Sequence, residues 1–357
     1  MRRGNATTLS DVAREVGVTP MAVSVVLNGT QSQSRVSDAT RVRILEVAKR
    51  LQYRPNGMAR GLVQRKVDTI GIVSPVGTGN LYWHEILDGV LLASSRHRQN
   101  TSILPVTGWE ENAEAIVDFG DGRIDSVLLV SPLLEPNIVA RLTSHIPVAT
   151  IHPNYEYEGA FNVYSNENDG AYEATKYLIS QGHRDIAHFG GPQDWSGGRE
   201  RMLGYLRAMK EAGLEIRPHR LFHTGFSMMD GRARAYDMIR SCSTTELPTA
   251  IFCGSDGVAF GVMQVLAEAG IAVPDQISII GFDDNMLSQI TMPQITTVRQ
   301  PFEAMAKVAV ESLVTEVANQ SAKRRSDPVD DAEAATQQTR KIVLPVDLVV
   351  RETVRRI

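Results

Sequence analysis

The spacing of apolar residues changes near Asp68, and this change constrains the fold more than any other feature of the sequence. Before it, apolar residues recur at helical spacing in three short stretches between positions 8 and 51. After it, short apolar runs such as 69–73 and 126–130 alternate with longer helical patterns such as 83–98. Such alternation is typical of a parallel sheet covered by helices. The chain is therefore expected to fold as an all-α head followed by an α/β body.

The head has the pattern of a helix-turn-helix. Apolar residues at helical spacing predict a first helix over about 9–16, with Ser10 available as its N-cap. A glycine turn follows, and Thr19 can cap a second helix. A third helix is expected over about 37–51, with Leu45 on its apolar side. Two short helices joined by a glycine turn and supported by a third form a common DNA-reading unit.

Charge is unevenly distributed between the head and the body. Residues 1–66 hold twelve Lys and Arg against four Asp and Glu, which is a net charge of +8. The whole chain carries -4, so the remaining residues carry -12. A basic head on an acidic body favours binding of a polyanion by the head alone. Charge by itself is equally compatible with a solvated helical face.

Three strings carry a specific resemblance: TLSDVA at 8–13, VTPMAVSVVLN at 18–28 and YRPNGMARGL at 53–62. They resemble the lac repressor/GalR family of bacterial transcription regulators, and further matches extend the resemblance over nearly the whole chain. It implies a helix-turn-helix head and a bilobal α/β body with two parallel-sheet lobes, similar to periplasmic binding proteins. The implied domains are 1–54 for DNA binding, 55–66 for a hinge helix or linker, and 67–357 for effector binding and dimerisation. The implied lobes are 67–165 with 297–325, and 166–296 with 326–357, so that the chain crosses between them near 165, 296 and 325.

The resemblance also implies which residues of the head meet DNA. The short donors that would contact phosphates are Thr8, Ser24, Asn28 and Tyr53. The side chains that would face base edges in the major groove are Pro20, Met21, Ala22 and Val25. Because none of these four can form a bidentate hydrogen-bonded pair with a base, we expect apolar reading, for example of thymine methyl groups, and more reliance on the hinge and on DNA shape. The other members of the predicted interface are Leu9, Thr19, Asn56, Arg60 and Leu62.

Residues 55–63 resemble the hinge of the family, which becomes helical only in the dimer on operator DNA. By this resemblance Leu62 would wedge into the minor groove, with Arg60 as the nearby cation. Gly57 and Gly61 each weaken an isolated helix by about 1 kcal/mol relative to Ala, which fits a segment that folds only when bound. The alternative is a plain linker with an exposed leucine.

Ligands of open α/β sheets bind at the carboxyl ends of the strands, so the residues that follow strands are the candidates for an effector site. The predicted site is Trp83, His152, Trp195, Arg201, Phe226, Asp256 and Asp283. Asp283, Asp256 and Arg201 match ligand-contacting positions of the family, and their groups suit hydroxyl ligands. The aromatic residues could stack on a sugar ring or simply pack a lobe. His152 could line the cleft or lie on the outer surface.

The expected effector is a small polar molecule, in particular a saccharide. Trp195 stands where some relatives place an arginine for purine binding, which argues against a nucleobase. The alternative function is that of a soluble sugar-binding protein or sugar-active enzyme without a DNA-binding role. No HExxH, GxSxG, P-loop or complete GxGxxG motif has the required context, and the histidines do not cluster at metal-ligand spacing. Enzyme activity, a metal and a cofactor are therefore not expected.

The expected assembly is a homodimer, because two heads must straddle a pseudo-palindromic operator in double-stranded DNA. No run of about 18 apolar residues predicts a membrane span. Cys242 and Cys253 are expected to be reduced core residues, as in a cytoplasmic protein that acts at the nucleoid. Residues 320–340 are rich in Ser, Asp, Ala and Gln and are expected to form a polar surface insertion. Repression is the expected sense of regulation, from the resemblance alone.

Overall fold

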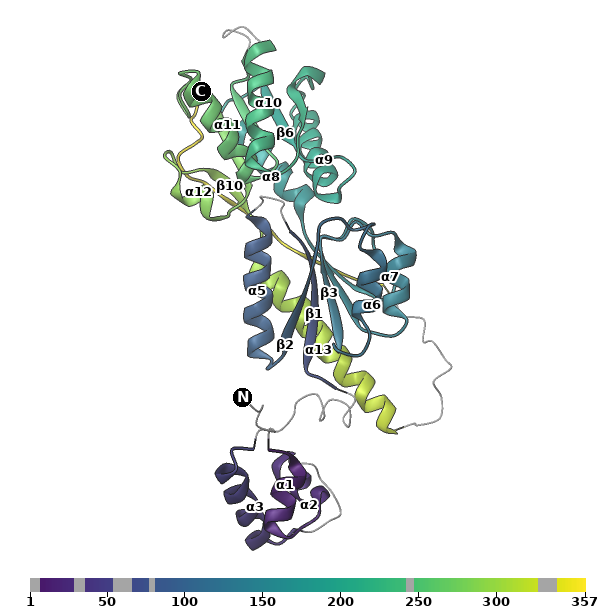
Figure 1. The fold of residues 1–357 in the computed structure, drawn as a ribbon. Helices are drawn as coiled ribbons and strands as arrows, with labels where there is room; N and C mark the ends of the chain where they lie inside the picture. Colours follow the sequence, from purple (N-terminus) through teal and green to yellow (C-terminus); the bar gives the residue numbers. More distant parts are fainter. Residues whose placement is uncertain (1–6, 29–35, 54–65, 77–80, 242–246, 327–338) are drawn as a thin grey trace. The chain divides into compact units, whose positions relative to one another are not determined.

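The computed structural model describes residues 7–28, 36–53, 66–76, 81–241, 247–326 and 339–357 (Figure 1). The chain divides into two compact units between Val67 and Asp68, where the spacing of apolar residues also changes. Each unit has a hydrophobic core of its own. No helix within these ranges has both the length and the apolarity that crossing a bilayer requires.

The small unit consists of three helices, α1 (Leu9–Val16), α2 (Pro20–Asn28) and α3 (Asp38–Arg50). Their apolar faces enclose one core, in which Val12, Val23 and Ile44 are fully buried. The predicted all-α head is therefore confirmed. Leu45, which was expected on the apolar side of α3, is instead 49% exposed, because the neighbouring Ile44 occupies the core-facing position.

The start of α1 differs in detail from the prediction. Thr8, and not Ser10, is the N-cap. The Thr8 hydroxyl accepts a hydrogen bond from the Asp11 backbone N–H (3.3 Å), and the Asp11 carboxylate accepts one from the Thr8 backbone N–H (2.9 Å). This reciprocal arrangement is a capping box. Gly17 ends the helix with φ of +75°, a conformation that favours glycine, and Thr19 caps α2 as expected.

The first lobe of the large unit is a six-stranded parallel sheet in the order β11-β5-β4-β3-β1-β2. Its strands are β1 (Thr69–Pro75), β2 (Asn100–Val106), β3 (Ser126–Val130), β4 (Val148–Ile151), β5 (Phe161–Ser165) and β11 (Arg340–Leu344). One face is covered by α5 (Tyr82–Arg96) and α13 (Phe302–Ser326), and the other by α6 (Ala113–Phe119) and α7 (Pro136–Thr143) (Figure 1). Because helices cover both faces, β3 is buried along its whole length.

The second lobe repeats this plan with the strand order β12-β10-β9-β8-β6-β7, in which only β12 is antiparallel to its neighbour. Its strands are β6 (Ile186–Gly190), β7 (Leu221–His223), β8 (Ala250–Cys253), β9 (Ser278–Asp283), β10 (Thr296–Arg299) and β12 (Asp347–Val349). One face is covered by α8 (Glu167–Ser180) and α9 (Ser196–Glu211), and the other by α10 (Met228–Ser241) and α11 (Asp256–Glu268). The short helix α12 (Met286–Ile290) follows β9. The bilobal α/β body is therefore confirmed.

The chain passes between the lobes three times, and two crossings lie later than predicted. The first follows β5, near 165 as expected. The second follows Arg299 and not 296, because β10 pairs with β9 in the second sheet. The third follows Leu344 and not 325, because β11 pairs with β5 in the first sheet.

The expected surface insertion at 320–340 is correspondingly shorter. Residues 320–326 continue α13, because this stretch contains no Gly or Pro to end the helix. Arg340 begins β11. The middle of the expected insertion, 327–338, lies outside the described residues.

Candidate functional site

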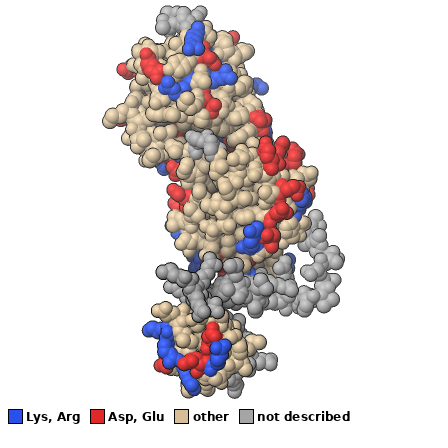
Figure 2. Space-filling model, viewed as in Figure 1, with Lys and Arg blue, Asp and Glu red and all other residues tan. Residues whose placement is uncertain are grey.

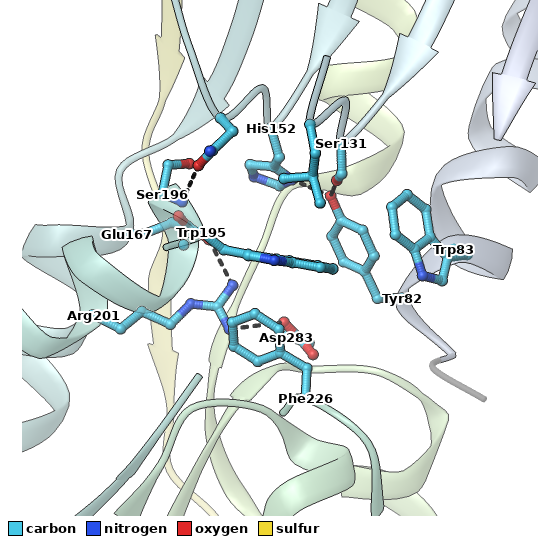
Figure 3. Close-up of a pocket in the computed structure, with 13 residues that line it drawn as sticks. Tyr82, Trp83, Ser131, His152, Glu167, Trp195, Ser196, Arg201, Phe226 and Asp283 are labelled. Carbon is cyan, nitrogen blue, oxygen red and sulfur yellow. Dashed lines mark hydrogen bonds and ion pairs between the residues drawn. The ribbon is translucent and has the colours of Figure 1, made fainter. Parts of the chain in front are cut away.

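A cavity lies between the two lobes at the carboxyl ends of their strands and encloses about 520 Å³, part of it open to solvent (Figure 3). The first lobe contributes Tyr82, Trp83, Ser131, Leu133, His152 and Asn154. The second lobe contributes Glu167, Trp195, Ser196, Gly197, Arg201, Phe226 and Asp283. Six of the seven positions predicted for an effector line this cavity, and Asp256 does not.

The lining side chains stand where the fold places residues that follow strands. Ser131 and His152 come directly after β3 and β4, and Asp283 is the last residue of β9. Trp83 lies in the first turn of α5, which follows β1, and Trp195 is the N-cap of α9, which follows β6. The crevice outside such strand ends is the usual ligand position in open α/β sheets.

A buried ion pair forms the charged centre of the cavity. Arg201 Nη2 lies 2.6 Å from Glu167 Oε1, and both side chains are less than one-tenth exposed. The guanidinium also donates to the Gly254 carbonyl and lies 4.1 Å from the centre of the Phe282 ring. Burial opposes ionisation of Glu167, but the positive charge of Arg201 outweighs it and holds the pKa of Glu167 below its usual range. The pair is therefore charged at neutral pH.

Asp283 is the second carboxyl group of the cavity. Its Oδ1 accepts a hydrogen bond from the Gln300 amide at 2.7 Å and lies 3.9 Å from Arg201 Nη1. Burial raises the pKa of Asp283 to about 7, although Arg201 and Gln300 both act in the opposite direction. Asp283 thus changes charge near neutral pH.

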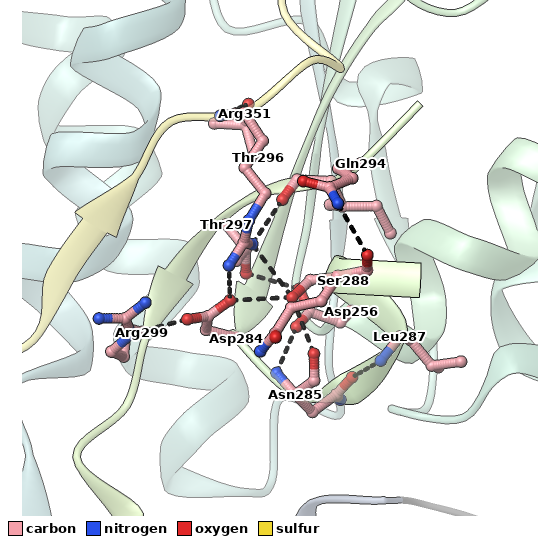
Figure 4. A network of polar contacts seen from close by, with 12 residues as sticks. Asp256, Asp284, Asn285, Leu287, Ser288, Gln294, Thr296, Thr297, Arg299 and Arg351 are labelled. Atoms are coloured by element: carbon pink, nitrogen blue, oxygen red, sulfur yellow. Dashed lines mark hydrogen bonds and ion pairs between the residues drawn. The ribbon is translucent and has the colours of Figure 1, made fainter. Parts of the chain in front are cut away.

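The backbone that carries Asp283 is in an unusual conformation. Asp283 and Asp284 have φ of +120° and +60°, and each such non-glycine residue costs on the order of 1–3 kcal/mol. Two arginines hold the Asp284 carboxylate, Arg299 through Nε and Arg351 through Nη2, each at 2.6 Å (Figure 4). These ion pairs fix the turn after β9 and so direct Asp283 into the cavity.

Asp256 belongs to this supporting network and not to the lining of the cavity. It is the first residue of α11 and is fully buried. Its Oδ1 accepts from the Thr297 hydroxyl at 2.5 Å and its Oδ2 from the Asn285 backbone N–H at 2.9 Å (Figure 4). Asp256 therefore does not line the cavity, because its side chain turns towards β10 and the loop after β9, and its contact with a ligand stays a prediction. Its place suits a positioning role for that loop.

A chain of hydrogen bonds runs from the first lobe to Asp283. Tyr82 Oη and His152 Nδ1 lie 2.5 Å apart, His152 Nε2 and Ser165 Oγ lie 2.9 Å apart, and Ser165 Oγ donates to Gln300 at 2.6 Å. Since the Ser165 hydroxyl donates to Gln300, it accepts from His152 Nε2–H, and His152 Nδ1 is left to accept from Tyr82. Burial lowers the pKa of His152 to about 4, so its ring is neutral at neutral pH. His152 thus lines the cavity and does not lie on the outer surface.

The aromatic side chains provide apolar faces beside these polar groups. The ring centres of Trp195 and Phe226 are 6.1 Å apart with an interplanar angle of 56°, and Phe226 also lies 5.0 Å from the Arg201 guanidinium. Trp83 lines the cavity and is also packed in the core of the first lobe, with 8% of its surface exposed. Trp83 therefore packs the lobe and also borders the cavity, whereas Trp195 and Phe226 are partly exposed.

Two hydrogen bonds connect the lobes at the cavity. Asn154 Oδ1, in the first lobe, accepts a hydrogen bond from the Ser196 backbone N–H at the start of α9 (2.7 Å). The Ser196 hydroxyl donates to the Pro153 carbonyl at 3.2 Å. These bonds join the two lobes beside the aromatic residues (Figure 3).

Seven of the residues that line the cavity were not predicted from the sequence, for different reasons. Tyr82 adjoins Trp83 and could have been found from the same signal. Glu167 opens α8 directly after β5, a strand that the sequence reasoning did not predict, so its position was not considered. Asn154 and Ser196 meet only through the tertiary fold. The others are Ser131, Leu133 and Gly197.

In the small unit, most residues predicted to contact DNA reach the surface. Those exposed are Thr8, Thr19, Pro20 and Met21, and those partly exposed are Leu9, Ala22, Ser24 and Tyr53. The Thr8 hydroxyl donates to the Asp11 carboxylate at 2.7 Å, so a phosphate contact by this hydroxyl would replace that bond. Asn28 ends α2, but its side chain lies outside the described part of the chain, as do Asn56, Arg60 and Leu62.

Val25 differs from its predicted role. It is only 7% exposed, although it is not part of the core cluster that contains Val23 and Val26. A side chain that is buried to this extent cannot reach a base edge unless the conformation of the head changes and exposes it. By contrast Met21 is 67% exposed.

Charged side chains also distinguish the units. Cations at the surface of the small unit include Arg14, Arg41, Arg43 and Lys49. On the face shown in Figure 2, basic groups flank a smaller acidic group on the small unit, and acidic groups gather over the part of the first lobe that carries α6 and α7. Within the described ranges, no group of three or more His, Cys, Asp or Glu could hold a metal ion.

Two family models match the chain. The model for bacterial regulatory proteins of the lacI family matches residues 8–56, and the model for a periplasmic binding protein-like domain matches residues 175–354. The HTH-type transcriptional repressor PurR of Vibrio campbellii is 34% identical over 323 residues, which are 89% of this chain and 94% of PurR.

Solved structures agree with the fold. The lac repressor dimer bound to operator and the anti-inducer ONPF has a TM-score of 0.82 at 22% identity, covering 98% of this chain and 100% of that chain. The transcriptional regulator CelR in its cellobiose complex has a TM-score of 0.69 at 27% identity, covering 97% and 99%. With the helix-turn-helix head, the bilobal body and the match to PurR, the chain belongs to the lacI family of bacterial regulatory proteins and is a DNA-binding regulator of transcription.

Proposed function

We propose that the chain is a repressor that works in the cytoplasm, at the nucleoid, as a homodimer on a pseudo-palindromic operator. We further propose that a saccharide bound between the lobes controls its affinity for DNA. The observation that carries the proposal is the cavity, in which the aromatic rings of Trp195 and Phe226 adjoin the charged groups of Arg201 and Asp283. No catalytic role is assigned to these groups.

The chemistry of this cavity suits a sugar ring. The C–H face of a sugar can pack on Trp195 or Phe226, while neighbouring hydroxyls donate to Asp283 and accept from Arg201. A small number of polar groups converging on an apolar lining is typical of such sites. The cellobiose complex of CelR supports a saccharide, because that relative has the same fold over nearly its whole length.

Control of DNA binding requires that the effector prefer one arrangement of the lobes. A ligand held by both lobes has a different affinity for the open and the closed cavity. This difference in binding free energy limits how far the ligand can change the affinity of the head for DNA. On DNA we propose apolar base reading by Pro20, Met21 and Ala22. We propose phosphate contacts by Thr8, Ser24, Asn28 and Tyr53, and a minor-groove wedge at Leu62.

The test joins ligand binding to operator binding. A thermal-shift screen of neutral sugars should find a ligand that raises the melting temperature of the full chain. The same ligand should then change operator affinity by a factor of about 5 to 150, which is the usual range of allosteric coupling. Phe226→Ala should lose the response to the sugar but keep salt-dependent operator binding. A sugar that binds without changing operator affinity would contradict its proposed role as effector.

A further inference from the structure

Glu167 occupies a position in the cavity that is well suited to an anion. Its carboxylate pairs with Arg201 at 2.6 Å and is buried. It also lies against the first turn of α9, since a methyl group placed on Gly197 would be 3.2 Å from each of its two carboxylate oxygens. Figure 3 shows the Glu167 and Arg201 side chains approaching each other beside Trp195.

This position combines two features that attract negative charge. The first turn of a helix has N–H groups without partners within the helix and a partial positive charge, and a guanidinium binds carboxylates and phosphates by two parallel hydrogen bonds. A ligand carboxylate or phosphate would use both. In this protein the Glu167 carboxylate already occupies that position.

The residues that line the cavity offer an anionic ligand no second cation. Arg201 is the only Lys or Arg among the thirteen lining residues described above. His152 is neutral because burial lowers its pKa to about 4. Asp283 adds negative charge as it ionises, and its Oδ1 lies 3.9 Å from Arg201. A ligand anion would therefore meet two carboxyl groups and one guanidinium that is already paired.

We propose that Glu167 is a specificity-determining residue that makes the cavity select uncharged sugars over sugar acids and sugar phosphates. The inference rests on the proposed saccharide effector and names its charge class. The physical reason is that bringing a second anion beside a buried carboxylate is costly unless a further cation compensates it. Rejection by an unfavourable charge contact can separate ligands that share the same ring.

Matched pairs of ligands test the proposal on the full chain. Each pair keeps one ring and changes only the charge: glucose with glucuronate and glucose 6-phosphate, galactose with galacturonate, ribose with ribose 5-phosphate, and cellobiose with cellobionate. Isothermal titration calorimetry should show that the chain binds the neutral member of one pair at least about tenfold more tightly than its acid. An acid that binds as tightly as its neutral partner overturns the inference, while it leaves the saccharide proposal intact. Absence of binding by every member contradicts the saccharide proposal, and this inference with it.

Glu167→Gln identifies the residue responsible. Glutamine keeps the volume, and its amide oxygen can still accept from Arg201, but the negative charge is gone. The preference for the neutral member should fall by about tenfold or more, mainly through tighter binding of the acid. Glu173→Gln is the matched control, because it removes the same charge from an exposed position on the same helix. An unchanged preference in Glu167→Gln overturns the assignment, and the comparison of ligands on the unaltered chain remains decisive if this variant does not fold.

Discussion

At the scale of single residues, Asp283 predicts a dependence of effector affinity on pH. Burial raises its pKa to about 7 in the free cavity. Sugar hydroxyls donate to the ionised carboxylate, so bound sugar lowers this pKa and binding below pH 7 releases a proton. Affinity should therefore rise by up to tenfold per pH unit just below pH 7 and level off above it. Calorimetry at pH 5.5 to 8.5, in buffers of different ionisation enthalpy, measures both the slope and the proton.

Three neighbouring groups that line the cavity do not change charge in this interval. By contrast, burial and the charge of Asp283 raise the pKa of Asp256, behind the cavity, well above its usual range. Glu167 stays ionised because Arg201 lowers its pKa against the effect of burial, and His152 stays neutral because burial lowers its pKa to about 4. Burial also raises the pKa of Tyr82 well above its usual value, so Tyr82 stays neutral. Asp283→Asn should accordingly bind sugar more weakly and without the slope. A slope that persists in Asp283→Asn would assign the proton to another group.

The residues of the cavity were predictable only where local sequence reports their place. Trp195 and Arg201 follow β6, a strand with a strong apolar pattern, so their positions near a sheet edge could be inferred. Phe226 follows the short strand β7, in which no residue is fully buried. Asp256 follows the apolar strand β8, but the direction of its side chain depends on Thr297 and Asn285, which are distant in the sequence. Val25 shows the same limit in the head, since a run of apolar residues in α2 does not reveal which of them is covered.

At the scale of elements, we expect a hydrogen bond at the start of α9 to help hold the two lobes together. Asn154 accepts a hydrogen bond from the backbone N–H of Ser196, a donor that has no partner within its own helix. Asn154→Ala removes this acceptor, which costs about 1 kcal/mol for a helix N-terminus. Because the bond exists only while the lobes are close, effector affinity should fall by about fivefold.

The matched control is Asn154→Asp, which keeps the acceptor oxygen at a helix N-terminus where negative charge is favourable. It should bind a neutral sugar within about twofold of the unaltered chain. The thermal unfolding of the ligand-free chain should change little in either variant, since the bond lies at the edge of the cavity. Equal affinities of the Ala variant and the unaltered chain would show that the contact does not hold the closed arrangement.

Helices and strands were predicted well where their apolar pattern is continuous. They were predicted poorly where the pairing of a strand with its neighbours decides which sheet it joins. The strands β1, β3, β8 and β9 have buried runs that the sequence displays plainly. No residue of the strand β11 is fully buried, because it lies at the edge of the first sheet. Its half-polar sequence gave no sign of which lobe it joins, and this misplaced the third crossing.

At the scale of the whole molecule, the body has apolar side chains at its surface that suit an interface between two copies. Those on and after α12 are Met286, Ile290 and Met292, at 56%, 63% and 95% exposed. Leu91 and Leu92 of α5 and Ile103 of the edge strand β2 are between 37% and 47% exposed. Figure 1 shows α5, β2 and α12 along the same side of the large unit. Several exposed apolar side chains on one side of a protein commonly mark an interface with another protein.

Ile290→Glu combined with Met292→Glu should therefore produce a monomer in sedimentation experiments. Operator affinity should fall by about a hundredfold or more, because two linked heads gain that factor from binding one site together. Sugar affinity should stay unchanged, since neither Ile290 nor Met292 lines the cavity. Leu203→Glu is the matched control, because Leu203 is 51% exposed on α9, away from these elements, and should leave the dimer intact. A double variant that remains dimeric would place the interface elsewhere, whereas a monomer with full operator affinity would contradict the need for two heads.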